Sequence, residues 1–270
     1  MSRRCAARDG GGPRPVTERV VLVTGAGRRV GRAIAEALGA DGWGVAVHFH
    51  ASAEGAAETV AAIRARSGRA EAFAADLRDP DACTGLLPRV TAWGGRLDAA
   101  VLSAAGMTRT PLGDTTAAAF DAIVALNLRA PFLLAQAAAA VLPAGGAIVT
   151  IADHLAEEPT PGFEVHGIAK AGVVALTRHL ASALAPRVRV NAVSPGVVLL
   201  PDGAAPTLAT RLADEALLRR IGTPDDVVGA VRDLLDAPFV TGQVLRVDGG
   251  RLARGAGSSE LVEPAQLHDQ

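Results

Sequence analysis

Three residues of this sequence, a histidine, a lysine and an aspartate, are of types that suit proton or charge chemistry. His166 stands four residues before Lys170, which places the two side chains on one face of a helix. Asp153 lies upstream of both. Histidine can donate a proton near neutral pH because its ordinary pKa is about 6.5. A lysine ammonium beside it disfavours the imidazolium form, so we expect His166 to be a weak acid unless Asp153 offsets that charge.

These side chains suit the reduction of a C=N bond. A ketone needs a proton on its oxygen as it is reduced, and loss of a matched acid costs about 10²–10⁴ in rate. An iminium ion already carries a positive charge and needs no acid, and the carboxylate of Asp153 would stabilise it. The nearby Glu157, Glu158 and Glu164 either line the mouth of such a site or form a solvated acidic loop.

The elements that must position these residues follow from an alternation of short β-rich runs with Ala-rich helical runs. Asp79-Pro80 and Thr223-Pro224 are typical helix starts, with a capping side chain followed by proline. Nearly continuous apolar strands are typical of a parallel sheet buried on both faces. We therefore predict an α/β fold, a single doubly wound (Rossmann) domain with a parallel seven-stranded sheet between two helical layers. Strands are predicted at residues 19–24, 44–50, 70–75, 98–102, 147–151, 187–193 and 243–247, and helices at 30–40, 53–67, 115–141, 165–184 and 223–235.

Composition and charge narrow the class of protein. The 270 residues are 49% hydrophobic and only 3% aromatic, with a formal net charge of -1 and two cysteines. This charge makes nucleic acid a poor partner. The lack of a secretory signal and of an apolar run of about 20 residues predicts a cytoplasmic protein without a membrane span. We expect a disordered extension at residues 1–16, one domain over residues 17–250 and a flexible tail at residues 251–270.

A glycine-rich turn follows the first predicted strand. Residues 24–31, Thr-Gly-Ala-Gly-Arg-Arg-Val-Gly, let the backbone turn tightly and approach a pyrophosphate at a helix N-terminus. The alternative is an ordinary tight turn between a strand and a helix. Its position after the first strand of a βαβ unit favours the phosphate site.

The end of the second predicted strand indicates NADPH. An NAD site usually places a carboxylate here to accept from the ribose 2′-hydroxyl, but residues 48–52 read His-Phe-His-Ala-Ser. Arg28, Arg29, His48 and Ser52 instead offer donors for a 2′-phosphate. The alternative is that they are solvated surface residues.

The turn resembles the Thr-Gly-x-x-x-Gly-x-Gly motif of the short-chain dehydrogenase/reductase family. Arg29 replaces the middle glycine, and this variant, with the His-Phe-His-Ala-Ser run, is similar to the pteridine reductase branch. Further motifs follow in the family's order as far as Val247-Asp248-Gly249-Gly250, so the resemblance covers about residues 20–250. The resemblance and the turn together assign cofactor contacts to Gly25, Arg28, Arg29, Val30, Gly31, His48, Phe49, His50, Ser52, Asp76, Leu77, Ser103, Ala104, Ala105, Lys170, Pro195, Gly196 and Val198.

The resemblance also implies a catalytic set. Family members place a serine, a tyrosine and a lysine in the site, with an asparagine upstream, and the tyrosine supplies the proton. Aligned by motif, the asparagine, serine, tyrosine and lysine positions hold Asn127, Asp153, His166 and Lys170. The chain contains no tyrosine, and an aspartate at the serine position is itself a trait of the pteridine branch. His166 is therefore either a replacement proton donor or a bystander in a vacated slot.

Three functions remain open. The leading hypothesis is an NADPH-dependent reductase of a C=N, iminium or hemiaminal-derived carbon in a small molecule, suited to tailoring or detoxifying an alkaloid-like natural product, as in antibiotic biosynthesis or resistance. The alternatives are a pterin or ketone reductase that uses His166 as proton donor, and a catalytically inactive cofactor-binding subunit. Residues 107–111 lack the aromatic side chain that commonly stacks on a pterin. The resemblance implies a homotetramer or homodimer that pairs through the long helices and the last strand.

Overall fold

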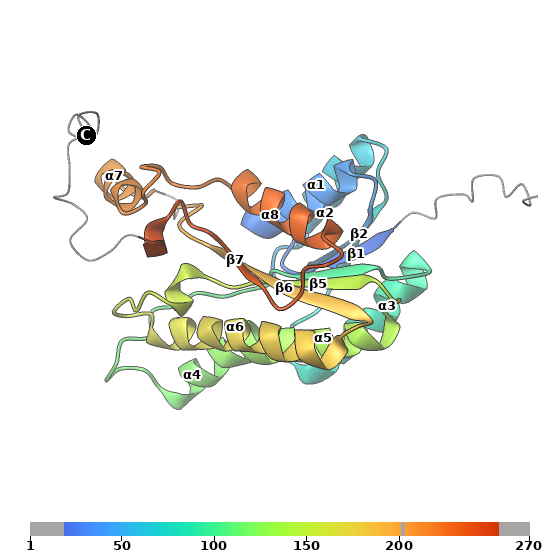
Figure 1. The fold of residues 1–270 in the computed structure, drawn as a ribbon, viewed down its shortest axis with the longest axis horizontal. Helices are drawn as coiled ribbons and strands as arrows, with labels where there is room; N and C mark the ends of the chain where they lie inside the picture. The colour runs from blue at the N-terminus through green and yellow to red at the C-terminus, as the bar shows by residue number, and fades with distance from the viewer. Residues whose placement is uncertain (1–18, 201–202, 254–270) are drawn as a thin grey trace, which may run out of the picture.

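One parallel sheet organises the protein. The computed structural model describes residues 19–200 and 203–253, which form seven strands between two layers of helices (Figure 1). The spatial order is β3-β2-β1-β4-β5-β6-β7, and all neighbours are parallel. The strands are β1 (Val20–Val23), β2 (Gly44–Phe49), β3 (Ala70–Ala74), β4 (Ala99–Leu102), β5 (Gly146–Ile151), β6 (Val188–Pro195) and β7 (Val244–Val247). The predicted fold class, a single doubly wound domain, is confirmed.

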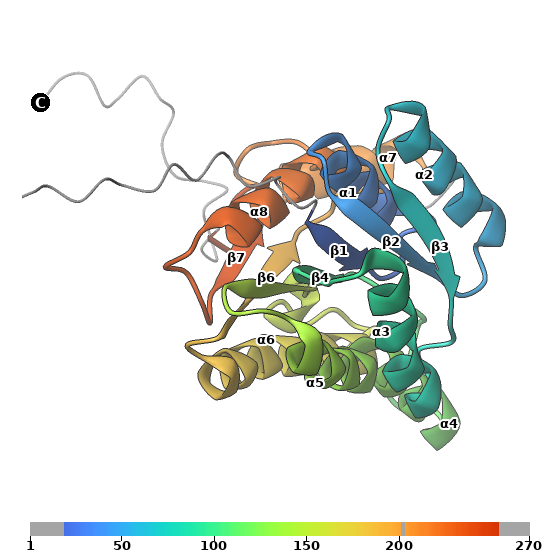
Figure 2. The same ribbon diagram turned by 90° about the vertical axis from the view of Figure 1, so that its right-hand side faces the viewer.

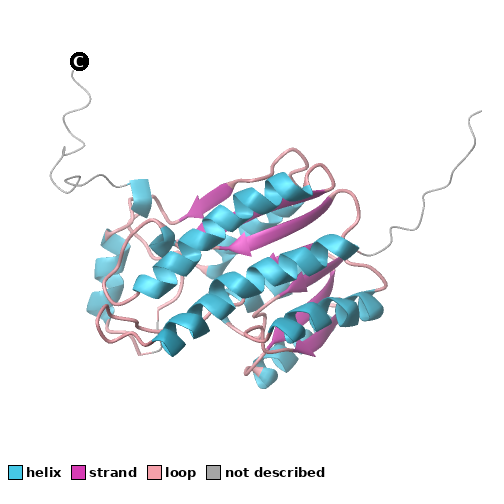
Figure 3. Ribbon diagram, turned by 90° about the horizontal axis from the view of Figure 1, so that it is seen from below, coloured by secondary structure: helices cyan, strands magenta, loops and turns pink. Residues whose placement is uncertain are grey.

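Helices cover both faces of the sheet because every strand at its centre is apolar on both sides. In β1, Val21 and Val23 belong to one core and Val20 and Leu22 to the other. Figure 2 shows the two layers on either side of the strands, and Figure 3 shows long helices that lie over the sheet and run along its strands. One layer consists of α1 (Arg29–Ala40), α2 (Ala53–Ala65) and α8 (Pro224–Asp236), and the other of α3 (Pro80–Gly94), α4 (Ala117–Val124), α5 (Ala130–Val141) and α6 (Glu164–Leu184).

Two helix starts predicted from cap residues are confirmed. The carboxylate of Asp79 accepts a hydrogen bond from the N–H of Asp81, and Pro80 is the first residue of α3. Thr223 and Asp226 form a reciprocal capping box at the start of α8. Local side-chain chemistry therefore sets both boundaries.

The helix predicted over residues 115–141 is not continuous. A π-helical turn at Ala125–Arg129 separates α4 from α5 and contains Asn127. By length and composition alone, Ala117–Val141 is apolar enough to cross a membrane. In the fold, however, its inner face packs in the core with Leu134 and Ala138, as a helix of a globular domain does.

Two further elements of the structure were not predicted from the periodicity of the sequence. The helix α7 (Pro206–Asp214) lies between β6 and α8. A 3₁₀ turn at Arg251–Ala253 continues the chain after β7, and Arg251 in it is largely buried. The predicted flexible tail at residues 251–270 is therefore wrong for its first three residues, because Arg251 is held by ion pairs. The rest of that tail and the predicted extension at residues 1–16 lie outside the described residues.

Candidate active site

The cleft predicted for the cofactor and substrate would lie at the carboxyl ends of the strands, where the strand order reverses. β1 pairs with β2 on one side and with β4 on the other, so the chain leaves β1 in both directions. In open α/β sheets such a switch point opens a crevice in which ligands bind. Most of the residues predicted for the cofactor and for catalysis lie at or just after the ends of β1 to β6 at this edge, whereas Asn127, His166 and Lys170 lie on helical elements.

The glycine turn forms a cradle that side chains would fill. A Cβ on Gly31 would lie 2.3 Å from the carbonyl oxygen of Gly25, and a Cβ on Gly25 would lie 2.8 Å from the Cα of Ala104. Arg29 adopts a φ of 51°, so it keeps the left-handed backbone that glycine favours although it carries a side chain. The turn then enters α1, whose first residues follow Arg28. This close backbone packing fits a pyrophosphate at the start of α1.

His48 does not bind a phosphate, which corrects its predicted role. Its side chain is buried, with a relative exposure of 2%. Its Nδ1 accepts a hydrogen bond from the N–H of Gly25 at 3.1 Å, and its Nε2 lies 3.1 Å from the carbonyl oxygen of Ala75. Burial lowers the pKa of His48 to about 4 despite the hydrogen bond to Ala75. The neutral imidazole is thus a structural link between β1, β2 and β3.

The other polar residues at this end remain at the rim. Arg28 is exposed, and the guanidinium of Arg29 donates to the carbonyl oxygen of Leu199 at 3.1 Å. Asp76 pairs with Arg78 at 2.8 Å, which holds the pKa of that carboxyl well below its usual range. The remaining rim residues are His50, which lies 3.7 Å from Asp76, together with Ser52 and the half-buried Phe49 and Val30.

Small residues are required where β4 ends. The N–H of Ala104 donates to the hydroxyl of Thr24 at 3.0 Å, which joins the ends of β4 and β1. The sequence Ser103-Ala104-Ala105 therefore allows the close approach to Gly25 that larger side chains would prevent. Leu77 was predicted at the cofactor, but its side chain lies in the core beneath this edge. Only the backbone of Leu77 is therefore left for the predicted cofactor contact, which stays a prediction.

The structure brings together Asp153, His166 and Lys170. Asp153 follows β5 and caps a 3₁₀ turn at His154–Ala156 by accepting from the N–H of Leu155 at 2.9 Å. His166 lies in the first turn of α6, and its Nε2 is 3.4 Å from Oδ2 of Asp153. Lys170 lies one turn further along and donates to the carbonyl oxygen of Ile151 at 2.7 Å.

Asn127 joins this group through a shared carbonyl oxygen. Its Nδ2 donates to the carbonyl oxygen of Gly106 at 2.9 Å and to that of Ile123 at 3.0 Å. Nδ1 of His166 lies 3.2 Å from the same oxygen of Gly106. The Oδ1 of Asn127 is buried without a hydrogen-bond partner. The π-helical turn thus aims the amide at the loop after β4, beneath the predicted site.

The charges of the site differ in exposure. The side chain of Asp153 is 26% exposed, whereas that of His166 is 2% exposed. Burial would raise the pKa of Asp153, but His154, His166 and the N–H of Leu155 outweigh it and hold the pKa below its usual range. Burial lowers the pKa of Lys170 to about 8, although attraction to Asp153 opposes the shift. The ionised Asp153 is therefore the member of this trio that reaches the surface of the cleft.

The three glutamates after Asp153 have other partners. Glu157 is paired with Arg246, and Glu158 is paired with Arg251. One oxygen of Glu164 accepts from the N–H of Gly162 at 3.0 Å. Glu157 and Glu158 are partly exposed and neutralised by arginines, so neither offers free negative charge to the predicted mouth.

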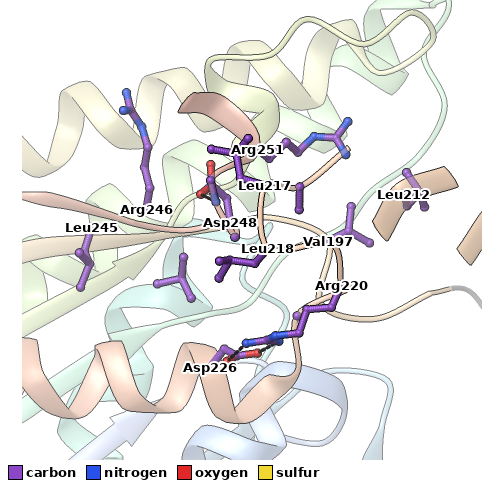
Figure 4. A pocket seen from close by; sticks show the side chains of 15 residues that line it. Val197, Leu212, Leu217, Leu218, Arg220, Asp226, Leu245, Arg246, Asp248 and Arg251 are labelled. Atoms are coloured by element: carbon purple, nitrogen blue, oxygen red, sulfur yellow. Dashed lines mark hydrogen bonds and ion pairs between the residues drawn. The ribbon is translucent and has the colours of Figure 1, made fainter. Parts of the chain in front are cut away.

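The nicotinamide side of the predicted site is built by two interlocking turns. The N–H of Gly196, directly after Pro195, donates to the carbonyl oxygen of Val247 at 2.9 Å. A Cβ on Gly196 would lie 2.8 Å from the Cα of Asp248. Behind these turns a cavity of about 460 Å³ is lined by Val197, Leu212 and Leu217 among others (Figure 4). Arg220 and Arg251 also line this cavity, whereas His166 and Asp153 do not. Val198, which was predicted to contact the cofactor, is half-buried and packs against one of the two cores.

Comparisons with known proteins agree with this architecture. The family described as Enoyl-(Acyl carrier protein) reductase matches residues 25–251. A 3-oxoacyl-[acyl-carrier-protein] reductase of Synechocystis is 35% identical over 247 residues, 87% of this chain and 97% of the relative. The angucycline C-6 ketoreductase LanV, solved with bound NADP, superposes with a TM-score of 0.81 at 32% identity over 87% of this chain and 96% of its own. A short-chain dehydrogenase from Burkholderia cenocepacia in complex with NADP gives a TM-score of 0.83 at 35% identity over 87% and 98%. This chain belongs to the short-chain dehydrogenase/reductase family.

Proposed function

We propose that this protein is an NADPH-dependent reductase that acts on a C=N or iminium carbon of a small molecule, such as an alkaloid-like natural product. The observation that carries the proposal is the arrangement around Asp153. Its ionised carboxylate is the partly exposed group, while both ring nitrogens of the buried His166 face protein oxygens. A cation finds a counter-ion there, whereas a ketone oxygen finds no proton directed at it.

The preference for NADPH is supported by the ends of β1 and β2. Arg28 and Arg29 offer positive charge at the glycine turn, and residues 48–52 contain no carboxylate to pair with a ribose hydroxyl. The two solved relatives described with NADP support the same assignment. Bound NADPH supplies the hydride for the reduction.

The chain's own groups would then divide the remaining tasks. The ammonium of Lys170 keeps donors beyond its hydrogen bond to Ile151 and would hold the ribose hydroxyls. Asp153 would lower the energy of the iminium by a charge interaction in a partly dry site. His166 would hold Asp153 in place from behind, with Gly106 fixing the other side of the ring.

A second candidate is a ketone reductase in which His166 donates the proton. The contact between His166 and Asp153 is long, at 3.4 Å, so a substrate oxygen could replace the carboxylate as partner of Nε2. The ketoreductase and oxoacyl reductase relatives support this candidate. The pteridine-branch motifs, and the aspartate at position 153 in particular, support the C=N candidate instead.

A matched pair of substrates tests the two candidates. We would measure NADPH oxidation with 3,4-dihydroisoquinoline and with 1-tetralone, which differ at the reacting C=N or C=O group but share a bicyclic shape. The proposal expects a higher kcat/KM for the imine, a loss of about tenfold to a hundredfold in Asp153→Asn, and little change in His166→Gln. Faster ketone turnover that is lost in His166→Gln supports the second candidate. Tight NADPH binding without turnover of either substrate supports an inactive subunit.

We also propose that the protein forms a homodimer or homotetramer through its helical face. Phe120, Phe132 and Ile168 are exposed large apolar side chains on α4, α5 and α6. A second copy of this chain would cover them. Light scattering after size-exclusion chromatography tests this, with a monomeric mass for wild type as the contradicting result.

A further inference from the structure

Arg251, directly after the closing motif at the carboxyl end of the sheet, pairs with two carboxylates. Its Nε and Nη2 donate to the two carboxylate oxygens of Glu158, at 2.5 and 2.8 Å, and its Nη1 donates to Glu215 at 2.5 Å. The arginine side chain is only 12% exposed, whereas each glutamate is 35% exposed. Glu158 and Glu215 raise the pKa of Arg251, and Arg251 lowers the pKa of Glu158. Such charge-assisted, bidentate contacts are stronger and more directional than exposed ion pairs.

The closing motif Val247-Asp248-Gly249-Gly250 sets the position of Arg251. Gly249 and Gly250 have φ values of 62° and 81°, a backbone that glycine adopts without strain. The carboxylate of Asp248 accepts from the N–H groups of Gly250 and Leu252, both at 2.9 Å, and so caps the 3₁₀ turn. The motif thereby turns the chain back towards the site.

The two partners of Arg251 lie on segments that flank the candidate site. Glu158 ends the turn that begins with Asp153, and its N–H donates to the carbonyl oxygen of His154 at 2.9 Å. Glu215 ends α7, and the chain beyond it packs on the closing motif, with the N–H of Leu218 donating to the carbonyl oxygen of Gly249 at 3.0 Å. One guanidinium therefore joins the Asp153 turn, the end of α7 and the last turn of the domain (Figure 4 shows Arg251 beside Leu217).

We propose that Arg251 is a positioning residue for the reductase site. By holding Glu158 and Glu215 together, it keeps the carboxylate of Asp153 at the cleft and the end of α7 against the closing motif. The inference rests on the proposed role of Asp153. The guanidinium of Arg251 donates its hydrogen bonds to Glu158 and Glu215 and not to Asp153 or His166, so it acts through its glutamate partners.

A double-mutant cycle tests this role. Arg251→Met should lower kcat/KM for 3,4-dihydroisoquinoline by about tenfold to a hundredfold, because it leaves two partly buried carboxylates unpaired. In the Asp153→Asn background the same substitution should change kcat/KM by less than about threefold, since the carboxylate that Arg251 positions is already absent. Full additivity of the two losses would overturn the proposal. Glu158→Gln removes only the ion pair between Arg251 and the turn that begins with Asp153, and it perturbs the structure less than Arg251→Met does. It should reproduce most of the loss in kcat/KM.

Arg220→Met is the matched control. Arg220 lines the same cavity and makes a bidentate pair with Asp226, at 2.7 and 2.8 Å, but Asp226 belongs to α8 and not to the Asp153 turn. Its side chain is 52% exposed. The control should change kcat/KM by less than about threefold. An equal loss in Arg220→Met and Arg251→Met would show a general effect of cavity charge and overturn the positioning role.

Amide hydrogen exchange separates this inference from the proposed function. The N–H of Leu155 is bonded to Asp153, so its exchange rate reports directly on the position of that carboxylate. Arg251→Met should speed exchange at Leu155 at least tenfold in the protein without substrate, and Arg220→Met should leave it unchanged. Unchanged exchange in Arg251→Met would overturn the inference. If Asp153→Asn retains full imine turnover, the proposed function fails while this exchange result still decides the role of Arg251.

Discussion

The imidazole of His48 accepts a hydrogen bond from the backbone N–H of Gly25, with Nδ1 and N 3.1 Å apart. The same ring reaches the carbonyl oxygen of Ala75 through Nε2. An imidazolium has no lone pair and cannot accept from Gly25. The glycine turn is therefore held by a histidine that must stay neutral.

This requirement predicts a loss of stability in acid. Burial lowers the pKa of His48 to about 4 in the folded protein, whereas an unfolded histidine has a pKa of about 6.5. Between these values the unfolded chain binds more protons, so stability rises with pH. The contribution of the neutral His48 to the free energy of unfolding is complete above pH ~6.5. It falls by about 3 kcal/mol as pH drops towards ~4. Urea unfolding at a series of pH values measures it.

His48→Asn is the control for that prediction. The amide oxygen of asparagine can accept from Gly25, but it does not titrate in this range. The pH dependence of the free energy of unfolding should be shallower in the variant between pH ~6.5 and ~4. An unchanged slope would show that other groups cause the acid loss.

The lowered pKa of Lys170 predicts that activity declines as pH rises. Burial lowers the pKa of Lys170 to about 8, so the ammonium loses its proton as pH rises through that value. Binding of the ribose hydroxyls should weaken, and kcat/KM for NADPH should fall above pH ~8. Lys170→Met should be at least tenfold less active at pH ~7 and should show no decline near pH ~8. A wild-type profile that is flat to pH ~10 would contradict this assignment.

The close contacts of Gly31 allow a steric test of the glycine turn. A Cβ there would lie 2.3 Å from the carbonyl oxygen of Gly25, so Gly31→Ala should cost about 1–3 kcal/mol of stability and weaken NADPH binding at least tenfold. Gly85 lies in α3 and has nothing within 4 Å of the added Cβ. Gly85→Ala should instead gain about 0.5–1 kcal/mol. Thermal unfolding and cofactor fluorescence titration measure both variants.

The positive charge of Arg28 should contribute to the preference for NADPH over NADH. Arg28→Ala should lower kcat/KM for NADPH by about tenfold to a hundredfold, because a charge-assisted contact to the 2′-phosphate is lost, while NADH should change by less than about threefold. Arg66→Ala removes the same charge from the exposed end of α2 and should affect neither cofactor. Equal losses with both cofactors in Arg28→Ala would place Arg28 at the pyrophosphate instead.

Much of the fold was predictable because its causes are local. Apolar runs such as β1 require burial on both faces, and the caps at Asp79 and Thr223 start helices whatever lies around them. The grouping of His166 with Lys170 followed from helical spacing, whereas Asp153 was assigned to the group by the family resemblance. The break at Asn127 was not predictable, because Ala117–Val141 is apolar almost throughout and such a run has no clear periodicity in which the shift caused by a π-helical turn could be seen.

The sequence by itself determined most of the element order, the glycine turn and the grouping of Asp153, His166 and Lys170. Only the tertiary structure decided the partners of individual polar side chains. The imidazole of His48 could donate to a phosphate by its chemistry, yet both of its ring nitrogens are engaged by the backbone of Gly25 and Ala75. The carboxylate of Glu158 is likewise engaged by Arg251. The physical reason is that a hydrogen bond forms with whichever group the packed chain brings within about 3 Å. Glu158 and Arg251 lie 93 residues apart, so no local pattern encodes their contact.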